Sequence, residues 1–474
     1  MYLCMACTFH PLQQYPRGRY ALWMNSQERT AKTTPVAFSR LPDNGIVELV
    51  YSTTERTTNF SVFRNGKITS EDTVELGESE KIIPISPENN LIKHRAILLP
   101  DVAEEYESVS ELTALISGYL YKYVDLSHSF RKIATAYILL TWVYDAFNEL
   151  PYLRLRGDFG SGKTRALIVI GGVCYRPFFA SGASTVSPIF HTLDSFGGTL
   201  VLDEADFRFT DEKSELVKIF NNGNVRGFPV LRTAITMKKE FDPRAFNVYG
   251  PKIIAMRRSF EDQALESRFL TEEMGQRKLR SDIPINLPDE QKDEALALRN
   301  KLLMYRFKTL DSIKLKDHFE NSIYSPRLNQ ILIPLLSLIE DKTLRDEIWA
   351  TAGTIEGQLY RDRSATIEAG VLEVLLGMVA ESDRKHITIA EVTKAYSDKF
   401  GADYERPITN RMIGSVIRKR LRLSAYKSHG IYVVPITERE KIEHMAKRFG
   451  VEIDESGRHG DVGDVGAGID EMLT

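Results

Sequence analysis

The sequence predicts an α/β fold, in which a parallel sheet lies between a small β-rich module and a set of C-terminal helices. Three observations support this prediction. Apolar strand-like runs alternate with helix-like runs from residue 106 to residue 285, a pattern typical of parallel sheets. A glycine-rich loop, Gly157–Thr164, joins one strand-like run to the next helix-like run. Two carboxylates, Asp203 and Glu204, end another apolar strand.

The composition sets the size and the general class of the protein. The chain has 474 residues, too many for one ordinary core and enough for two to four domains. The net charge of -3 averages over these domains and indicates no partner. Three cysteines exclude a disulfide scaffold and favour a reducing, cytoplasmic location. The longest apolar stretch, Ile133–Phe147, is too short for a membrane span, so no membrane partner is expected.

Residues 1–34 show no periodicity and are predicted to be a disordered leader. Cys4, Cys7 and His10 could supply three zinc ligands. Because no second cysteine pair follows, a leader without metal is the favoured interpretation.

The next segment, 35–105, is predicted to be a small β-rich module. Val47–Tyr51 and Phe60–Phe63 alternate between apolar and polar residues, and the Asn65-Gly66 dipeptide is a strong hairpin signal. No residues of evident chemistry occur here. Two predicted helices over Val109–Leu150 then lead into the central sheet.

The glycine-rich loop matches the phosphate-binding pattern G-x-x-x-x-G-K-[ST]. Successive backbone N–H groups would point at the phosphates. Lys163 would reach the β- and γ-phosphates, and the Thr164 hydroxyl would hold Mg²⁺. ATP and Mg²⁺ are therefore the predicted cofactors, and a plain glycine-rich turn is the alternative. The predicted ATP-binding residues are Gly157, Asp158, Phe159, Gly160, Ser161, Gly162, Lys163 and Thr164.

The acidic pair supplies the other half of the predicted catalytic site. Gly198–Leu202 is a continuous apolar run, as expected for a parallel strand that is covered on both faces. Such a strand delivers its last residues to the carboxyl edge of the sheet, where nucleotides bind. Asp203 is the predicted Mg²⁺ partner, and Glu204 is placed to polarise the attacking water. This pair, coming after the phosphate-binding loop, indicates ATP hydrolysis.

A basic segment follows the acidic strand. Val225–Arg232 and the residues around Arg244 could pair as a β-hairpin, with Lys238 and Lys239 at its basic tip. Such cations would bind a nucleic-acid backbone without reading its sequence. Residues 286–362 are then predicted to be mostly helical.

Residues 363–437 predict three helices and then a two-stranded hairpin, which is the pattern of a winged helix. Thr409 is the expected N-cap of the third helix. Because no Asp or Glu occurs from Arg406 to Thr437, this region is expected to bind phosphates. A solvated basic helix or a protein-contact domain is the alternative. Residues 438–474 are predicted to form a helix and a disordered acidic tail. The predicted DNA contacts here are Arg411, Arg418, Lys419, Arg422 and Lys427.

With its motifs in this order, the chain resembles AAA+ ATPases. More closely, it resembles the replication helicases of mobile genetic elements, of the cassette-chromosome and pathogenicity-island type, which are related to the minichromosome maintenance helicases. The resemblance is most specific at Leu150–Thr164, Thr199–Asp206, Tyr249–Lys252 and Leu265–Phe269. It implies an AAA+ core over 106–285 with its preceding helices, followed by a helical lid over 286–362.

The resemblance also implies roles for two arginines. Arg268 matches an arginine that reaches the ATP of the neighbouring subunit, where a guanidinium offsets charge developing on the γ-phosphate. A simple ion pair with a carboxylate is the alternative for Arg268. Arg327 matches a lid arginine that senses the γ-phosphate. At the strand-end sensor position the chain departs from the family, because Met256-Arg257-Arg258 stands where Asn or Thr is usual.

Together these features predict a ring-forming, homo-hexameric DNA helicase for the replication of a mobile element. Single-stranded DNA is expected in the ring channel and duplex DNA at the winged helix. The alternative is a DNA-binding regulatory AAA+ ATPase that switches assembly without unwinding. A small-molecule kinase is disfavoured, because such kinases rarely carry a helical lid and a winged helix.

Overall fold

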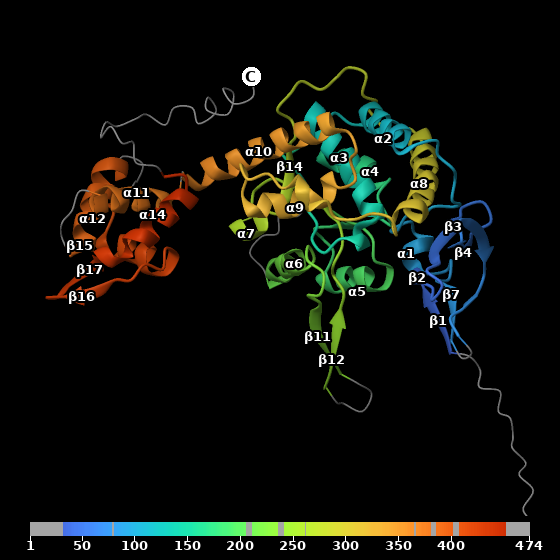
Figure 1. The fold of residues 1–474 in the computed structure, drawn as a ribbon, viewed down its shortest axis with the longest axis horizontal. Coiled ribbons are helices and arrows are strands. Elements are labelled where there is room, and N and C mark those ends of the chain that lie inside the picture. The colour runs from blue at the N-terminus through green and yellow to red at the C-terminus, as the bar shows by residue number, and fades with distance from the viewer. Residues whose placement is uncertain are drawn as a thin grey trace, which may run out of the picture.

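The computed structural model describes residues 32–451 except 78–79, 205–210, 236–240, 261, 365, 381–384 and 402–406. Figure 1 shows a central α/β body with a β-rich segment on one side and a smaller C-terminal domain on the other. The long helix α10 (Lys342–Ser364) runs from the body to this C-terminal domain. The predicted leader up to residue 31, Lys238 and Lys239, and the acidic tail from residue 452 lie outside the described residues.

The central sheet has five parallel strands in the order β14-β8-β13-β10-β9. All carboxyl ends of the strands therefore lie at one edge of the sheet and all amino ends at the other. Helix α4 (Lys163–Gly171) packs on β8, β10 and β13. The strands are β8 (Tyr152–Arg156), β9 (Phe178–Ser181), β10 (Leu200–Asp203), β13 (Lys252–Met256) and β14 (Phe269–Glu273).

The remaining helices enclose this sheet in shared cores. Serine side chains cap the N-termini of α2 and α3. Ser108 accepts a hydrogen bond from Glu111 N, and Ser127 accepts one from Phe130 N. The predicted lid helices α8 and α9 share one apolar core with α3 and β8. The helices are α2 (Val109–Tyr123), α3 (His128–Trp142), α5 (Val186–Phe196), α6 (Asp211–Asn222), α7 (Gln263–Glu266), α8 (Glu290–Thr309) and α9 (Pro326–Leu336). Across the described residues, no helix has the length and apolar character needed to cross a bilayer.

The N-terminal strands form two small sheets, in the orders β2-β3-β4-β5 and β1-β7-β6. The predicted hairpin turn at Asn65-Gly66 is confirmed, and both residues adopt the positive φ that a two-residue turn requires. The strands are β1 (Lys32–Val36), β2 (Phe38–Arg40), β3 (Ile46–Ser52), β4 (Thr57–Arg64), β5 (Lys67–Glu71), β6 (Val74–Glu75) and β7 (Glu80–Pro84). The short helix α1 (Asn90–Lys93) follows them.

Strand β3 departs from the predicted alternation, because Ile46–Val50 are all buried. Val47 on one face of β3 packs within the N-terminal strands, and Ile46 and Val50 on the other face pack against the central body, so the second face also loses its solvent. Glu48, at a position that alternation would expose, is 1% exposed. The N-terminal strands are therefore part of the main core.

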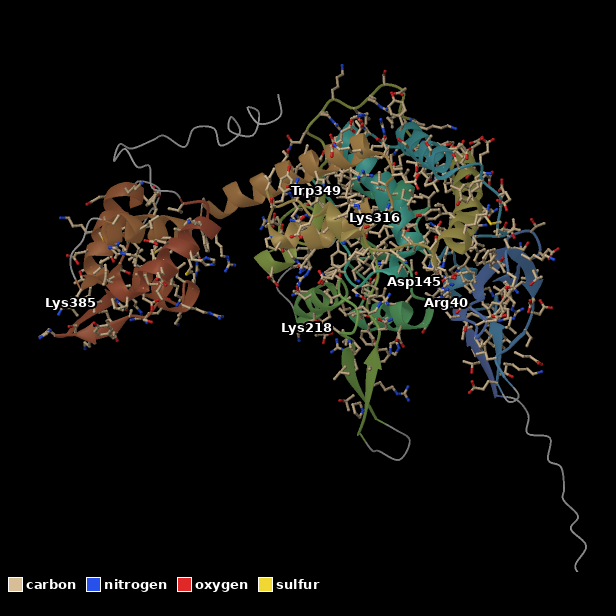
Figure 2. All side chains as sticks on the ribbon, in the orientation of Figure 1. Arg40, Asp145, Lys218, Lys316, Trp349 and Lys385 are labelled. Atoms are coloured by element: carbon tan, nitrogen blue, oxygen red, sulfur yellow. The ribbon has the colours of Figure 1, made fainter. Side chains whose placement is uncertain are left out.

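Four charged groups meet at this buried junction. Glu48 forms ion pairs with Arg176 and with Arg306, the latter over 2.5 Å between Nε and Oε1. Arg306 also pairs with Asp145 over 2.7 Å, and the Tyr175 hydroxyl donates to both Glu48 oxygens at 3.0 Å. Burial acts to raise the pKa of Asp145, but Arg306 outweighs it and holds this pKa below its ordinary value. Figure 2 labels Asp145 where the N-terminal strands meet the body.

The C-terminal domain has its own apolar core. Thr409 accepts a hydrogen bond from Met412 N, so the predicted N-cap is confirmed. Two features were not predicted: a third strand, β15, pairs with β17, and α13 continues as a π-helical turn over Val416–Arg420. The elements are α11 (Ile367–Ala380), β15 (His386–Thr388), α12 (Ile389–Phe400), α13 (Asn410–Ser415), β16 (Tyr426–Ser428), β17 (Ile431–Pro435) and α14 (Arg439–Arg448).

Candidate functional site

The glycine-rich loop joins the carboxyl end of β8 to the first turn of α4. Gly162 caps the helix at φ +88°, a left-handed conformation that other residues adopt only with strain. A side chain at Gly157 would place its Cβ 2.5 Å from the Met274 carbonyl oxygen. The loop therefore depends on glycine for its backbone conformation at one end and for close packing at the other.

Lys163 lies within the curve of this loop. Its Nζ donates to the carbonyl oxygens of Gly157 and Asp158, both at 2.6 Å, and to Ser161 Oγ at 3.3 Å. The loop also leads into the N-terminus of α4, and the first N–H groups of any helix have no acceptor within that helix. The combination of an ammonium and a helix N-terminus suits the phosphates of a nucleotide.

The two predicted Mg²⁺ residues lie in contact. Thr164 Oγ1 donates to Asp203 Oδ2 over 2.7 Å, which joins the first turn of α4 to the end of β10. Among the described residues, no group of three or more His, Cys, Asp or Glu side chains could hold a metal. Mg²⁺ needs no such group, because it keeps several waters and binds one or two protein oxygens together with substrate phosphates. The hydroxyl and carboxylate present here fit that requirement.

Glu204 follows Asp203 in an uncommon backbone conformation. Its φ is +55°, although it is not glycine, and its N–H donates to Asp203 Oδ1 over 2.9 Å. Gly182 packs closely against it, since a Cβ at that position would lie 2.5 Å from the Glu204 carbonyl oxygen. The side chain is exposed at the carboxyl edge of the sheet. Strain of this kind is retained where surrounding contacts enforce it, and it often occurs at functional sites.

Arg268 lies at the opposite edge of the sheet. Its carbonyl accepts from Tyr152 N at the start of β8, and its Nη1 donates to Asn221 Oδ1 at 2.5 Å and to Ala264 O at 2.9 Å. Both acceptors are uncharged, and none of the carboxylates in the described part of the chain forms an ion pair with Arg268. From Tyr152, at the start of β8, to Gly157, just after its end, the extended chain spans about 16 Å at 3.3 Å per residue. This separation keeps Arg268 away from the phosphate-binding loop of its own chain.

Arg327, on the first turn of α9, lies beside Arg268 rather than beside the phosphate-binding loop. Burial lowers the pKa of Arg268, and the charge of Arg327 acts in the same direction. Arg327 Nη1 is 3.5 Å from Glu149 Oε2 and donates to Gln330 at 3.1 Å. Arg268 Nε and Arg327 Nη2 are buried and have no hydrogen-bond partner among the described residues. The two arginines thus form a cationic pair with spare donors at this edge.

Sequence reasoning missed the ion pair that fixes this region. Arg154, in the middle of β8, pairs with Glu266 over 2.5 Å, and both side chains are buried. The Arg154 Nε also donates to Thr271 over 3.0 Å. Glu266 lies two residues before Arg268, so the pair ties the arginine segment to the strand that carries the phosphate-binding loop. An arginine inside a buried strand was the available signal.

Lys252 is the first residue of β13. It fixes the base of the predicted basic hairpin, which precedes β13 in the chain, to the central sheet. Its Nζ donates to the carbonyl oxygens of Gly223, Val248 and Gly250 at 2.9 to 3.1 Å. Burial lowers the pKa of Lys252 to about 7. A buried amine thus joins the turn before the hairpin to the turn after it.

The basic hairpin consists of β11 (Val230–Ile235) and β12 (Phe241–Phe246), which pair antiparallel. Figure 1 shows it projecting from the body. Arg232, on β11, pairs with Glu215 over 2.9 Å. The predicted tip residues Lys238 and Lys239 lie outside the described residues.

The C-terminal domain carries a basic surface that includes an aromatic ring. The Arg418 guanidinium lies 4.6 Å from the centre of the Tyr432 ring, and Lys427 lies directly opposite Tyr432 in the β16–β17 hairpin. Tyr432 is 46% exposed. The five predicted DNA contacts of this domain, Arg411, Arg418, Lys419, Arg422 and Lys427, are all exposed.

The end of β13 lies between the phosphate-binding strand and the acidic strand. Arg257 and Arg258 are exposed there, and the Met256 carbonyl accepts from Gly157 N at 3.3 Å. Ser259 follows them in the chain, and its hydroxyl accepts a hydrogen bond from Arg156. The position that carries Asn or Thr in the resembled family is thus filled by cationic side chains.

Comparison with known sequences gave no matching family. The curated proteins likewise contain no match. Similar solved structures include the C-terminal region of NrS-1, with 13% identity, a TM-score of 0.33 and coverage of 82% of this chain and 96% of that chain. SCCmec type IV Cch, an active helicase, has 11% identity, a TM-score of 0.38 and coverage of 86% and 80%. A full-length MCM homolog from Methanopyrus kandleri has 10% identity, a TM-score of 0.35 and coverage of 64% and 68%.

Proposed function

We propose that this chain is an ATP-hydrolysing, ring-forming DNA helicase or translocase that serves the replication of a mobile genetic element. The observation that carries the proposal is the division of the catalytic groups between two edges of one sheet. The carboxyl edge holds the phosphate-binding loop, the hydrogen-bonded pair of Thr164 and Asp203, and Glu204. Arg268 and Arg327 occupy the amino edge, with buried N–H groups that lack partners among the described residues.

In each subunit, the residues at the carboxyl edge of the sheet carry out ATP hydrolysis. Backbone N–H groups of the loop and Lys163 would bind the phosphates of ATP, and Thr164 and Asp203 would hold Mg²⁺. Bound Mg²⁺ would neutralise charge that develops during phosphoryl transfer. Glu204, held in its constrained backbone, accepts a proton from the attacking water.

The amino edge completes the site of the neighbouring subunit. Because Arg268 and Arg327 lie far from their own loop, they serve a nucleotide only when another subunit presents its carboxyl edge to them. This contact is head-to-tail, and head-to-tail contacts close into rings when the rotation between subunits allows. A homo-hexamer is the assembly we propose, with α8, α9 and α10 (residues 286–362) as the lid region beside the two arginines.

DNA binds at two places in this proposal. The β11–β12 hairpin projects into the ring channel, where Lys238 and Lys239 bind the phosphate backbone of single-stranded DNA. Residues 363–437 act as a winged helix, and their exposed basic side chains contact the phosphates of duplex DNA. Both contacts depend on counterion release, so binding weakens steeply as salt increases.

A regulatory ATPase that switches assembly without unwinding is the second candidate. The basic surface around Arg418 and Tyr432 favours it, because this surface lies on a separately cored domain at the far end of α10 (Figure 1). In that case the C-terminal domain would be the main DNA-binding surface, and the hairpin would need no cations at its tip.

ATP turnover with and without single-stranded DNA, together with strand displacement on a forked duplex, tests the proposal. We expect DNA to stimulate turnover and displacement to require ATP. Lys163→Ala is the control and should abolish both. Turnover without displacement would favour the regulatory ATPase, and normal turnover by Lys163→Ala would overturn the assignment of the phosphate-binding loop.

A further inference from the structure

A cavity of about 350 Å³ lies at the far end of α4 from the phosphate-binding loop. Four parts of the chain enclose it: the end of β3, the segment after α1, the α4–β9 region and the first half of α8. Its apolar wall includes Ile97, Leu99, Ile168, Phe179 and Leu296. The cavity is within the size range of small-molecule sites, and its lining is that of a site with a few polar groups among apolar ones.

Arg299 of α8 lines this cavity and is only 7% exposed. Its Nε donates to Leu99 O at 3.2 Å, and its Nη1 donates to Gly172 O at 2.5 Å. No described residue forms an ion pair with it. Burial is the main cause that lowers the pKa of Arg299 to about 10, and the charge of Arg95 acts in the same direction.

The other buried arginines of the described chain provide an internal comparison. Arg154 pairs with Glu266, Arg176 pairs with Glu48, and Arg306 pairs with both Glu48 and Asp145. This agrees with the general rule that a charge is buried when a counter-charge is buried with it. Among these described arginines Arg299 is the exception, and it lines the cavity.

The charges at the cavity wall do not supply the missing partner. Arg95 and Lys292 add two cations, and Asp293 adds one carboxylate. Lys292 is paired with Asp289 over 2.7 Å. Arg95 adopts a φ of +53°, uncommon for a residue with a side chain. The local charge, with Arg299 included, remains positive.

We propose that this cavity binds a small amphipathic anion. Its carboxylate or phosphate would pair with Arg299, which still has guanidinium N–H groups available, and its apolar body would lie against Ile97, Leu99 and Phe179. The site is separate from the ATP site, because α4 stands between Gly172 and the phosphate-binding loop.

Isothermal titration of the full-length protein with octanoate, octyl phosphate and octan-1-ol tests this inference. The three probes share one apolar chain and differ in charge, and the two anions distinguish a carboxylate occupant from a phosphate occupant. Saturating Mg²⁺–ADP is present throughout, so that the phosphate-binding loop is blocked. We expect one anion per chain to bind about tenfold or more tighter than octanol, as a charge-assisted pair would provide.

Two variants locate the site. Arg299→Gln should remove the preference for the anion, and Leu296→Trp should fill the cavity and weaken every probe without altering Arg299. Arg448→Gln, at an exposed arginine of α14, is the control and should bind as the parent protein does. Equal binding of octanol and both anions, or unchanged anion binding in Leu296→Trp, would overturn the proposal. If Arg299→Gln fails to fold, Leu296→Trp still decides.

Discussion

Arg154 and Glu266 form a buried ion pair that joins the phosphate-binding strand to the segment carrying Arg268. The side chains are 2% and 6% exposed, and the Arg154 guanidinium also lies 5.1 Å from the centre of the Phe269 ring. The two halves of the proposed catalytic site are thus connected through the sheet. Removing one partner would leave an uncompensated charge in the core.

Glu266→Gln should therefore lower the free energy of unfolding by about 3 kcal/mol, as expected when one member of a buried pair is removed. Chemical denaturation measures this loss. Glu273→Gln, which breaks the more exposed pair with Arg156 on the same strand, is the matched control and should cost about 1 kcal/mol or less. Equal losses in the two variants would contradict the structural role of the buried pair.

Glu204→Gln should retain ATP binding and lose ATP hydrolysis by about 10² to 10⁴-fold, the range for removal of a general base. The amide keeps the shape of the side chain and the backbone conformation of residue 204. Fluorescent-nucleotide binding and steady-state turnover measure the two properties separately. Loss of nucleotide binding in this variant would instead make Glu204 a structural residue.

Mixtures of Arg268→Ala and Lys163→Ala subunits should recover part of the activity that each variant lacks. Some mixed interfaces would combine an intact phosphate-binding loop from one subunit with an intact arginine edge from the next. Turnover is measured across the mixing ratio, with each variant alone as the control. Failure of rescue at every ratio would count against Arg268 acting on a neighbouring subunit.

The pKa of Lys252 predicts how stability changes with pH. The folded pKa is about 7, below the ordinary 10.5, so between these values the unfolded chain binds more protons than the folded chain. The stability of the parent protein relative to Lys252→Met should therefore rise as pH increases from 7 to about 10. Denaturation midpoints of both proteins across this range measure the difference. A constant difference would mean that the three carbonyl groups keep the ammonium charged.

Glu48→Gln should destabilise the protein by about 3 kcal/mol or more, because Arg176 and Arg306 would both lose their shared carboxylate. Glu71→Gln, which breaks a partly exposed pair with Arg64 in the same strands, is the control. Thermal and chemical denaturation of the two variants should differ clearly. Similar midpoints would show that the junction tolerates the loss of the Glu48 carboxylate.

Short-range signals predicted much of this fold. The loop Gly157–Thr164, the capping residue Thr409 and the turn at Asn65-Gly66 depend on backbone rules that act within a few residues, so the sequence specifies them directly. The apolar run before Asp203 likewise indicated a buried parallel strand. These elements are found where they were predicted.

Long-range contacts were not predictable in the same way. The alternation in β3 suggested one solvent face, but Glu48 is buried by partners more than a hundred residues away. The position of Arg327 beside Arg268 depends on how α9 packs, which no local pattern specifies. The strand β15 is only three residues long and gave no periodic signal. Each of these features arises from tertiary packing.

The junction around Glu48 has a consequence for the order in which the chain can fold. Its charged members lie at positions 48, 145, 176 and 306, so the network closes only when segments separated by more than two hundred residues come together. Contacts of such long sequence separation form slowly. During synthesis the N-terminal strands must wait until α8 has left the ribosome before their carboxylate finds both guanidinium partners. A nascent chain that ends before α8 should therefore depend on chaperones or remain open to proteolysis at this junction.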